Sequence, residues 1–97
     1  MDSMRRQLRD VIRRTRALLA RPGNDFMYSR WENASEALAA MDGFLSRIDA
    51  GEVPTLSELS ILFAPTGSIQ EVSESSGWGE EFLEVAADFD RVSEQTG

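Results

Sequence analysis

The sequence predicts an all-α protein: a small helical bundle of three long and two short helices, in a single domain spanning residues 1–97. Three observations predict this class. Apolar residues recur at alternating steps of four and three along three segments, which places them on one face of a helix. Three capping boxes, in which Ser or Thr precedes Glu by three residues, mark helix starts. No apolar–polar alternation is long enough to predict a strand.

The first long helix is expected at 2–21, ended by Pro22 and Gly23. It carries most of the positive charge, because residues 1–21 hold seven arginines against two aspartates, whereas the rest of the chain holds three arginines against fifteen acids. The arginines all lie outside the apolar stripe of this helix. That stripe consists of Met4, Leu8, Val11, Thr15 and Leu18, and Ile12 and Leu19 widen it.

The second long helix is expected at 29–50, and we expect the other segments to pack around it. Ser29 and Glu32 form its capping box, and Gly51 can turn left-handed after its last turn. The consecutive large residues before this helix are expected to fill one end of the bundle. They are Phe26, Met27 and Tyr28, and the apolar stripe that follows consists of Trp31, Ala34, Leu38, Met41, Leu45 and Ile48.

Two short helices are expected at 55–64 and 68–76, because each segment begins with a capping box and ends at a residue that interrupts helices. The boxes are Thr55 with Glu58 and Ser68 with Glu71, and the interrupting residues are Pro65 and Gly77.

The third long helix is expected at 78–93. Its apolar stripe begins at Trp78, and we expect both Trp78 and Trp31 to be buried at the ends of the bundle. The remaining members of the stripe are Phe82, Val85, Phe89 and Val92.

The segment around Gly77 loosely matches the spacing of a helix-turn-helix. Ser73 precedes Gly77 by four residues, and the apolar Leu83 follows it by six. The second helix of this unit, however, offers carboxylates where phosphate binding needs Lys or Arg. They are Glu80, Glu84 and Asp88 with the neighbouring Glu81, so the composition argues against DNA binding and favours a plain helical corner.

The composition also removes the usual catalytic groups. The chain has no His, Cys or Lys, so the common general bases, thiolate nucleophiles and thiolate metal sites cannot be assembled. We therefore expect a protein that is not an enzyme and has no cofactor. An alternative is a metal-dependent, enzyme-like bundle that uses carboxylates alone, because oxygen ligands can bind Mg²⁺ or Ca²⁺.

The arginine-rich first helix has two interpretations. We expect it to pack beside the last helix, with its arginines bordering the acidic flank there. The alternative is that it binds anionic lipid or nucleic acid from the periphery, although the polar side lacks aromatic residues for stacking. The possible interaction surface consists of Arg5, Arg9, Arg13, Arg16, Glu81, Glu84 and Asp88.

No stretch of about 18 apolar residues predicts a transmembrane helix, and arginines interrupt each candidate core of a signal peptide. We therefore expect a cytoplasmic protein. The favoured function is protein–protein interaction or regulation without catalysis, through an unknown protein partner or self-association, rather than through DNA or a membrane.

Overall fold

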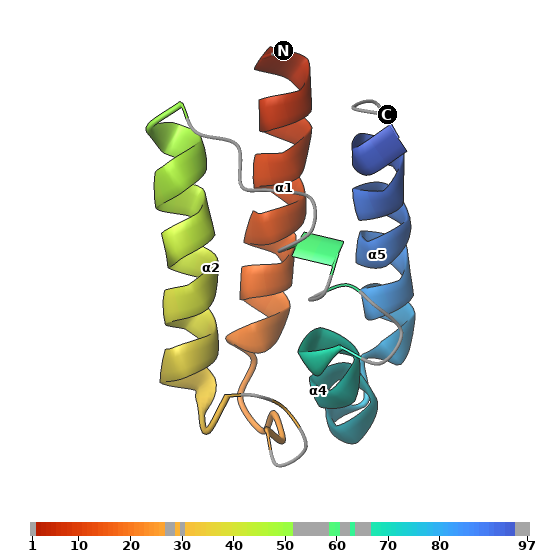
Figure 1. Ribbon diagram of the computed structural model, residues 1–97. Helices are drawn as coiled ribbons and strands as arrows, with labels where there is room; N and C mark the ends of the chain where they lie inside the picture. Colours follow the sequence, from red (N-terminus) through yellow and green to blue (C-terminus); the bar gives the residue numbers. More distant parts are fainter. Residues whose placement is uncertain are drawn as a thin grey trace.

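A computed structural model of the chain describes residues 2–26, 29, 31–51, 59–60, 63 and 67–94, with side chains from residue 4 onward. Its helices, labelled as in Figure 1, are α1 (Asp2–Leu19), α2 (Ala34–Asp49), α4 (Ser68–Ser76) and α5 (Gly79–Glu94). No strand occurs among these residues, so the all-α class is confirmed. The short helix predicted at 55–64 lies mostly outside the described residues, although residues 59, 60 and 63 are helical.

The three long helices lie side by side, with α1 between α2 and α5 (Figure 1). This corrects the expectation that the second helix is the centre of the bundle. The physical reason is the width of the apolar stripe on α1. Because Ile12 and Leu19 widen it, α1 buries side chains toward both neighbours, whereas Leu38 and Leu45 of α2 are only half-buried.

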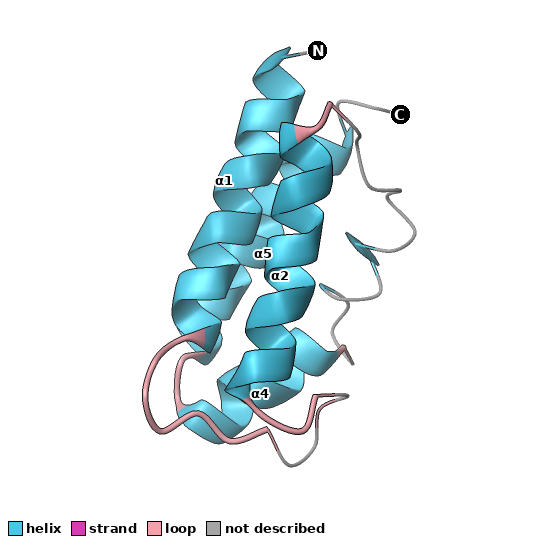
Figure 2. Ribbon diagram, turned by 90° about the vertical axis from the view of Figure 1, so that its left-hand side faces the viewer, coloured by secondary structure: helices cyan, strands magenta, loops and turns pink. Residues whose placement is uncertain are grey.

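Both outer helices run antiparallel to α1, since α1 descends in Figure 1 while α2 and α5 ascend. The side view shows α4 at the end of the bundle where α2 begins (Figure 2). There α4 packs against α5. Leu59 and Phe63 are buried in the same core, and the ring of Phe63 stacks on that of Phe89 with centroids 4.7 Å apart.

The start of α2 differs from the prediction. The helix begins at Ala34, and the Asn33 side chain accepts a hydrogen bond from the backbone N–H of Glu36 at 3.1 Å. Asn33 and Glu36 have the spacing of a capping box, and Asn is among the most favoured residues at this position. The Ser29 hydroxyl instead accepts from the Trp31 backbone N–H at 3.1 Å, before the helix.

The start of α4 also lacks the predicted side-chain cap. Ser68 is the first helical residue, Gly67 occupies the capping position, and the Glu71 N–H donates to the Gly67 carbonyl at 3.1 Å. The capping box predicted at Thr55 and Glu58 lies outside the described residues.

The predicted helix ends agree better with the structure. Gly51 and Gly77 follow α2 and α4 with φ values of +92° and +86°, the left-handed conformation that glycine adopts without steric cost. Beyond Gly77, the Trp78 N–H donates to the Ser73 carbonyl at 2.9 Å and closes the turn. These turns fix where the chain leaves each helix.

The predicted positions of large apolar side chains are largely confirmed. Trp31 and Trp78 are 7% and 2% exposed. Phe26 packs partly buried against the core, whereas residues 27 and 28 lie outside the described part of the chain. No helix in the described residues is both long enough and apolar enough to cross a membrane.

Candidate interaction surface

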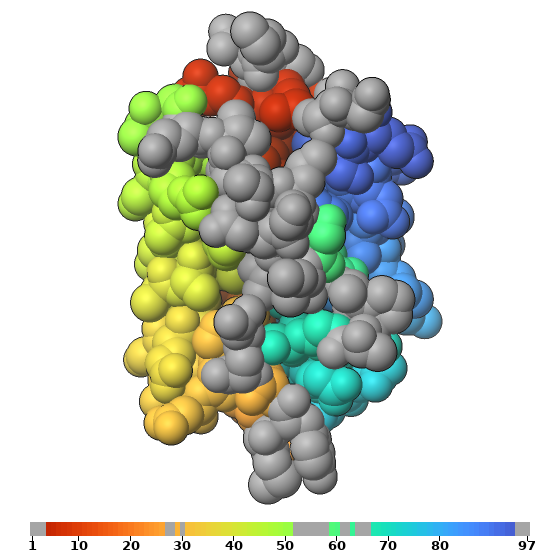
Figure 3. Space-filling model, in the orientation of Figure 1, coloured from red at the N-terminus to blue at the C-terminus, as the bar shows by residue number. Residues whose placement is uncertain are grey.

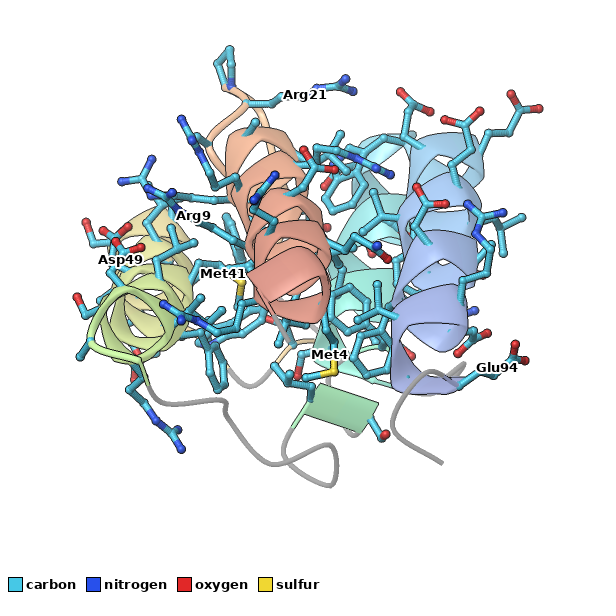
Figure 4. The ribbon with its side chains drawn as sticks, turned by 90° about the horizontal axis from the view of Figure 1, so that it is seen from above. Met4, Arg9, Arg21, Met41, Asp49 and Glu94 are labelled. Atoms are coloured by element: carbon cyan, nitrogen blue, oxygen red, sulfur yellow. The ribbon has the colours of Figure 1, made fainter. Side chains whose placement is uncertain are left out.

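Two ion pairs join α1 to α2. The Arg9 Nε lies 3.3 Å from the Asp49 carboxylate, and Arg16 contacts Asp42 through its Nε at 2.6 Å and its Nη2 at 3.3 Å. Seen along the helix axes, Arg9 and Asp49 lie next to each other on one side of the bundle (Figure 4). From the first pair to the second, the residue number rises by seven on α1 and falls by seven on α2, as expected for antiparallel helices.

Two more ion pairs lead to α5, one from Arg14 on the opposite flank of α1 and one from Arg21 in the turn just after α1. The Arg14 Nη2 donates to Asp88 at 2.6 Å, and the Arg21 Nη1 donates to Glu81 at 3.0 Å. These partners are again seven residues apart on each segment. The Asp88 carboxylate also pairs with Arg91 of its own helix. Arginines flanking α1 thus bind carboxylates on both neighbouring helices.

The ion pairs change the pKa values of the groups they join. The hydrogen bond from Arg16 lowers the pKa of Asp42 below its ordinary value of 3.8. The hydrogen bond from Arg21, together with a backbone hydrogen bond, lowers the pKa of Glu81 below 4.5. The pKa of Arg16 is raised by its bond to Asp42. Each of these shifts favours the charged form in the folded protein.

The structure brings together only part of the surface suggested by the sequence. As expected, α1 packs against α5 with arginines along its acidic flank, but through Arg14 and Arg21. Arg9 and Arg16 instead contact α2, and the Arg5 Nη2 donates to the Ile48 carbonyl at 3.2 Å. Within α1 the helical period explains this division, because residues 9 and 16 project from a different flank than residue 14. Arg21 lies in the turn that follows the helix.

Two exposed residues of that suggested surface have no ion-pair partner among the described residues. Arg13 and Glu84 are exposed, and neither forms an ion pair with another described residue. They lie on different helices, α1 and α5.

A side-chain contact missed by the sequence analysis joins the end of α1 to the start of α5. The Trp78 indole N–H donates to the Asn24 Oδ1 at 2.8 Å, while the Asn24 Nδ2 donates to the carbonyls of Leu18 and Leu19 at 2.9 Å each. Asn24 therefore satisfies two carbonyls at the end of α1 and positions Trp78 at the corner. The signal available in the sequence was a polar residue just beyond a helix end, where carbonyls lack partners.

Helices α4 and α5 form a corner around Gly77 and Trp78, but Leu83 does not face its interior. Its side chain is 65% exposed, and it is the one large hydrophobic residue that is exposed in the described part of the chain. It lies outside the four-three stripe of α5, which faces the core through Phe82, Val85, Phe89 and Val92.

A hollow of about 380 Å³ lies beside Leu83, between α5 and the helical residues 60 and 63. The corresponding elements, blue and bright green, adjoin on the face shown in Figure 3. Its lining is mostly apolar, with the stacked rings of Phe63 and Phe89 contributing to it. The remaining lining residues are Ser60, Gln70, Phe82, Leu83, Ala86, Ala87 and Asp90.

Apart from Arg91, carboxylates occupy the rest of the outer face of α5. These carboxylates are Glu80, Glu84, Asp90 and Glu94. None of them forms an ion pair with another described residue, and the one cation of the helix, Arg91, is bound to Asp88. We call these carboxylates, together with Leu83, Ala86 and Ala87, the Leu83 surface.

Two smaller hollows lie along α1, and both have a more charged lining than the hollow beside Leu83. One, of about 220 Å³, is lined by Arg5, Arg6, Arg9, Ile48 and Asp49. The other, of about 330 Å³, separates α1 from α5 and includes the Arg14 and Asp88 pair. Both therefore combine cations with carboxylates. Across the described residues, no three Asp or Glu side chains are grouped closely enough to hold a metal ion.

Comparisons with protein-family models, with curated proteins and with solved structures find no match for this chain.

Proposed function

We propose that the protein is a non-enzymatic, cytoplasmic interaction protein that binds another protein through the Leu83 surface. The observation that carries the proposal is the exposure of Leu83, at 65%, beside an apolar hollow. A large apolar side chain on an otherwise charged helical face adds nothing to the core. Its burial against a partner, in contrast, is favourable by about 25 cal/mol per Å² of apolar area.

The Leu83 surface is a better candidate than the arginines of α1. Arg9, Arg14, Arg16 and Arg21 already bind carboxylates of the same chain. An external lipid or nucleic acid would have to compete with these ion pairs. Arg6 and Arg13, the exposed arginines of α1 that form no ion pair with another described residue, have no exposed large apolar residue on their side of the helix.

Site-specific photo-crosslinking in the cells that make the protein tests this function. A benzophenone amino acid placed at residue 83 or 87 is expected to give one prominent adduct with a single protein. The matched control is the same amino acid at Ala39, an exposed position on α2. Equal adducts from positions 39 and 83, or none from either 83 or 87, would contradict the proposal.

A further inference from the structure

Building on the proposed function, we infer that the occupant of the Leu83 surface is a basic amphipathic helix of another protein. Its apolar side chains would enter the hollow beside Leu83, and its Lys or Arg side chains would meet the surrounding carboxylates. Three observations carry this inference: the shape of the Leu83 surface, its charge, and the residues that a second copy of the chain would expose.

The shape of the surface suits a helix lying along α5. Ala86 and Ala87 are small, so a second helix can approach the α5 backbone closely between Leu83 and Asp90. The stacked rings of Phe63 and Phe89 give the hollow a firm apolar wall. Glu80 and Glu94 are separated by about 21 Å at 1.5 Å per residue, so a partner helix of about four turns spans the surface.

The charges favour a basic partner. Glu80, Glu84, Asp90 and Glu94 leave four negative charges without an ion pair among the described residues, against the single positive charge of Arg91, which pairs with Asp88. Carboxylates beside an apolar hollow repel an acidic partner and attract a cationic one, which selects the partner and speeds association. They also repel the phosphates of nucleic acids and anionic lipids.

A second copy of the chain is a poorer occupant. The exposed arginines that form no ion pair with another described residue, Arg6 and Arg13, are accompanied on the outer side of α1 by Asp10, Ala17 and Ala20. That side presents no large apolar residue to fill the hollow. None of the described helices therefore exposes both parts of a basic amphipathic face.

The probe is a fluorescent synthetic peptide of about 16 residues, long enough for four helical turns, with leucines at four-three spacing and arginines on both flanks. Fluorescence anisotropy with the full chain is expected to show saturable binding. NMR chemical-shift changes are expected at residues 80–94. Raising the ionic strength from about 0.05 to about 0.3 M should weaken binding several-fold, because salt screens exposed charges.

Two variants with matched controls locate the contact. Leu83→Glu is expected to raise the Kd at least about tenfold, as for an apolar anchor at an interface, and Glu84→Arg should raise it several-fold. Ala39→Glu and Glu32→Arg make the same charge changes at exposed positions away from α5 and should leave the Kd unchanged. Circular dichroism of all four variants checks that they are folded.

Several results would overturn the inference. One is equal binding of a scrambled peptide with the same charge but no apolar face, and another is equal binding of a version in which glutamates replace the arginines. A third is an unchanged Kd in Leu83→Glu. Crosslinking at residue 83 separates this failure from that of the proposed function. An adduct with an acidic or uncharged segment of another protein overturns the basic helix alone, whereas an adduct only with a second copy of the chain overturns both. Loss of all adducts overturns both.

Discussion

Asn24 joins two parts of the bundle that are far apart in the sequence. Its amide N–H groups bind the last carbonyls of α1, and its carbonyl oxygen binds the buried indole of Trp78. A single polar side chain therefore fixes both the end of the first helix and the corner before the last.

We expect Asn24→Ala to lower the free energy of unfolding by about 1–3 kcal/mol, because it leaves the buried Trp78 indole N–H without an acceptor. Urea unfolding followed by tryptophan emission measures the change. In a Trp78→Phe background the same substitution should cost less, since the indole donor is already absent. An equal cost in both backgrounds would show that Asn24 acts only on the carbonyls of α1.

At this scale the sequence predicted burial better than hydrogen bonding. Trp31 and Trp78 are buried because each belongs to an apolar stripe, and stripes can be read from spacing alone. The bond from Trp78 to Asn24 depends instead on how two segments 54 residues apart meet. Nothing local distinguishes Asn33 from Ser29 as the cap of α2 either, since each precedes a Glu by three residues.

Among the elements, α1 takes the place that the sequence suggested for α2. All three long segments have similar stripes, so spacing predicted each helix and its ends to within a few residues, except at the start of α2. It could not rank the helices by burial. The width of the stripe is the better guide, since α1 buries residues toward both neighbours.

We expect Leu8→Ala in α1 to lower the free energy of unfolding by about 2–5 kcal/mol, as for other fully buried leucines. Leu45→Ala in α2 should cost clearly less, because its side chain is only half-buried. Leu83→Ala serves as the exposed control and should change stability by no more than about 0.5 kcal/mol. Chemical denaturation measures the loss of unfolding free energy in each of the three variants. A larger loss for Leu45→Ala than for Leu8→Ala would contradict the central position of α1.

A double-mutant cycle tests how α1 meets α5. Arg14→Glu and Asp88→Arg should each destabilise the protein, and together they should recover part of the loss, since pairs of this kind couple by about 0.2–1 kcal/mol. The recovery should be smaller at high salt. The comparison pair, Arg9→Glu with Glu84→Arg, should be additive because Arg9 contacts Asp49 of α2. Coupling between residues 9 and 84 would instead require a different helix order.

For the whole molecule, the absence of His, Cys and Lys shapes the response to pH. The pKa values of Asp42 and Glu81 are lowered by hydrogen bonds from Arg16 and Arg21. The stability they contribute is therefore complete above the ordinary values of 3.8 and 4.5, and is lost as the pH falls through the lower values of the folded state.

We expect the melting temperature to be nearly constant from about pH 6 to about pH 9, where Asp, Glu and Arg side chains keep their charge, and to fall steeply below about pH 4.5. Thermal melts followed by circular dichroism measure this profile. A double variant, Asp42→Asn with Glu81→Gln, should show a shallower acid slope. A marked change in melting temperature between pH 6 and pH 8 would contradict the expectation that only carboxylates cause the loss of stability in acid.

The division of charge was the feature of the whole chain that the sequence showed most directly, and it anticipated the contact of α1 with α5. It could not show that α2 pairs with two of the four arginines of residues 1–21 that form ion pairs with described residues of the outer helices, because acids are spread along both of these helices. The exposure of Leu83, in contrast, could be read from its position outside the four-three stripe of α5.

The order of the three long helices across the bundle differs from their order along the chain. Of the three, α1 is synthesised first, yet it lies between the other two. The side of α1 that faces α2 can be covered as soon as α2 is made, whereas the side that faces α5 stays uncovered until residues 79–94 are made. During translation, a growing chain would therefore expose an apolar strip on α1 and leave Arg14 and Arg21 without their carboxylates. Of the three long helices, the one that is synthesised first is therefore among the last to complete its packing.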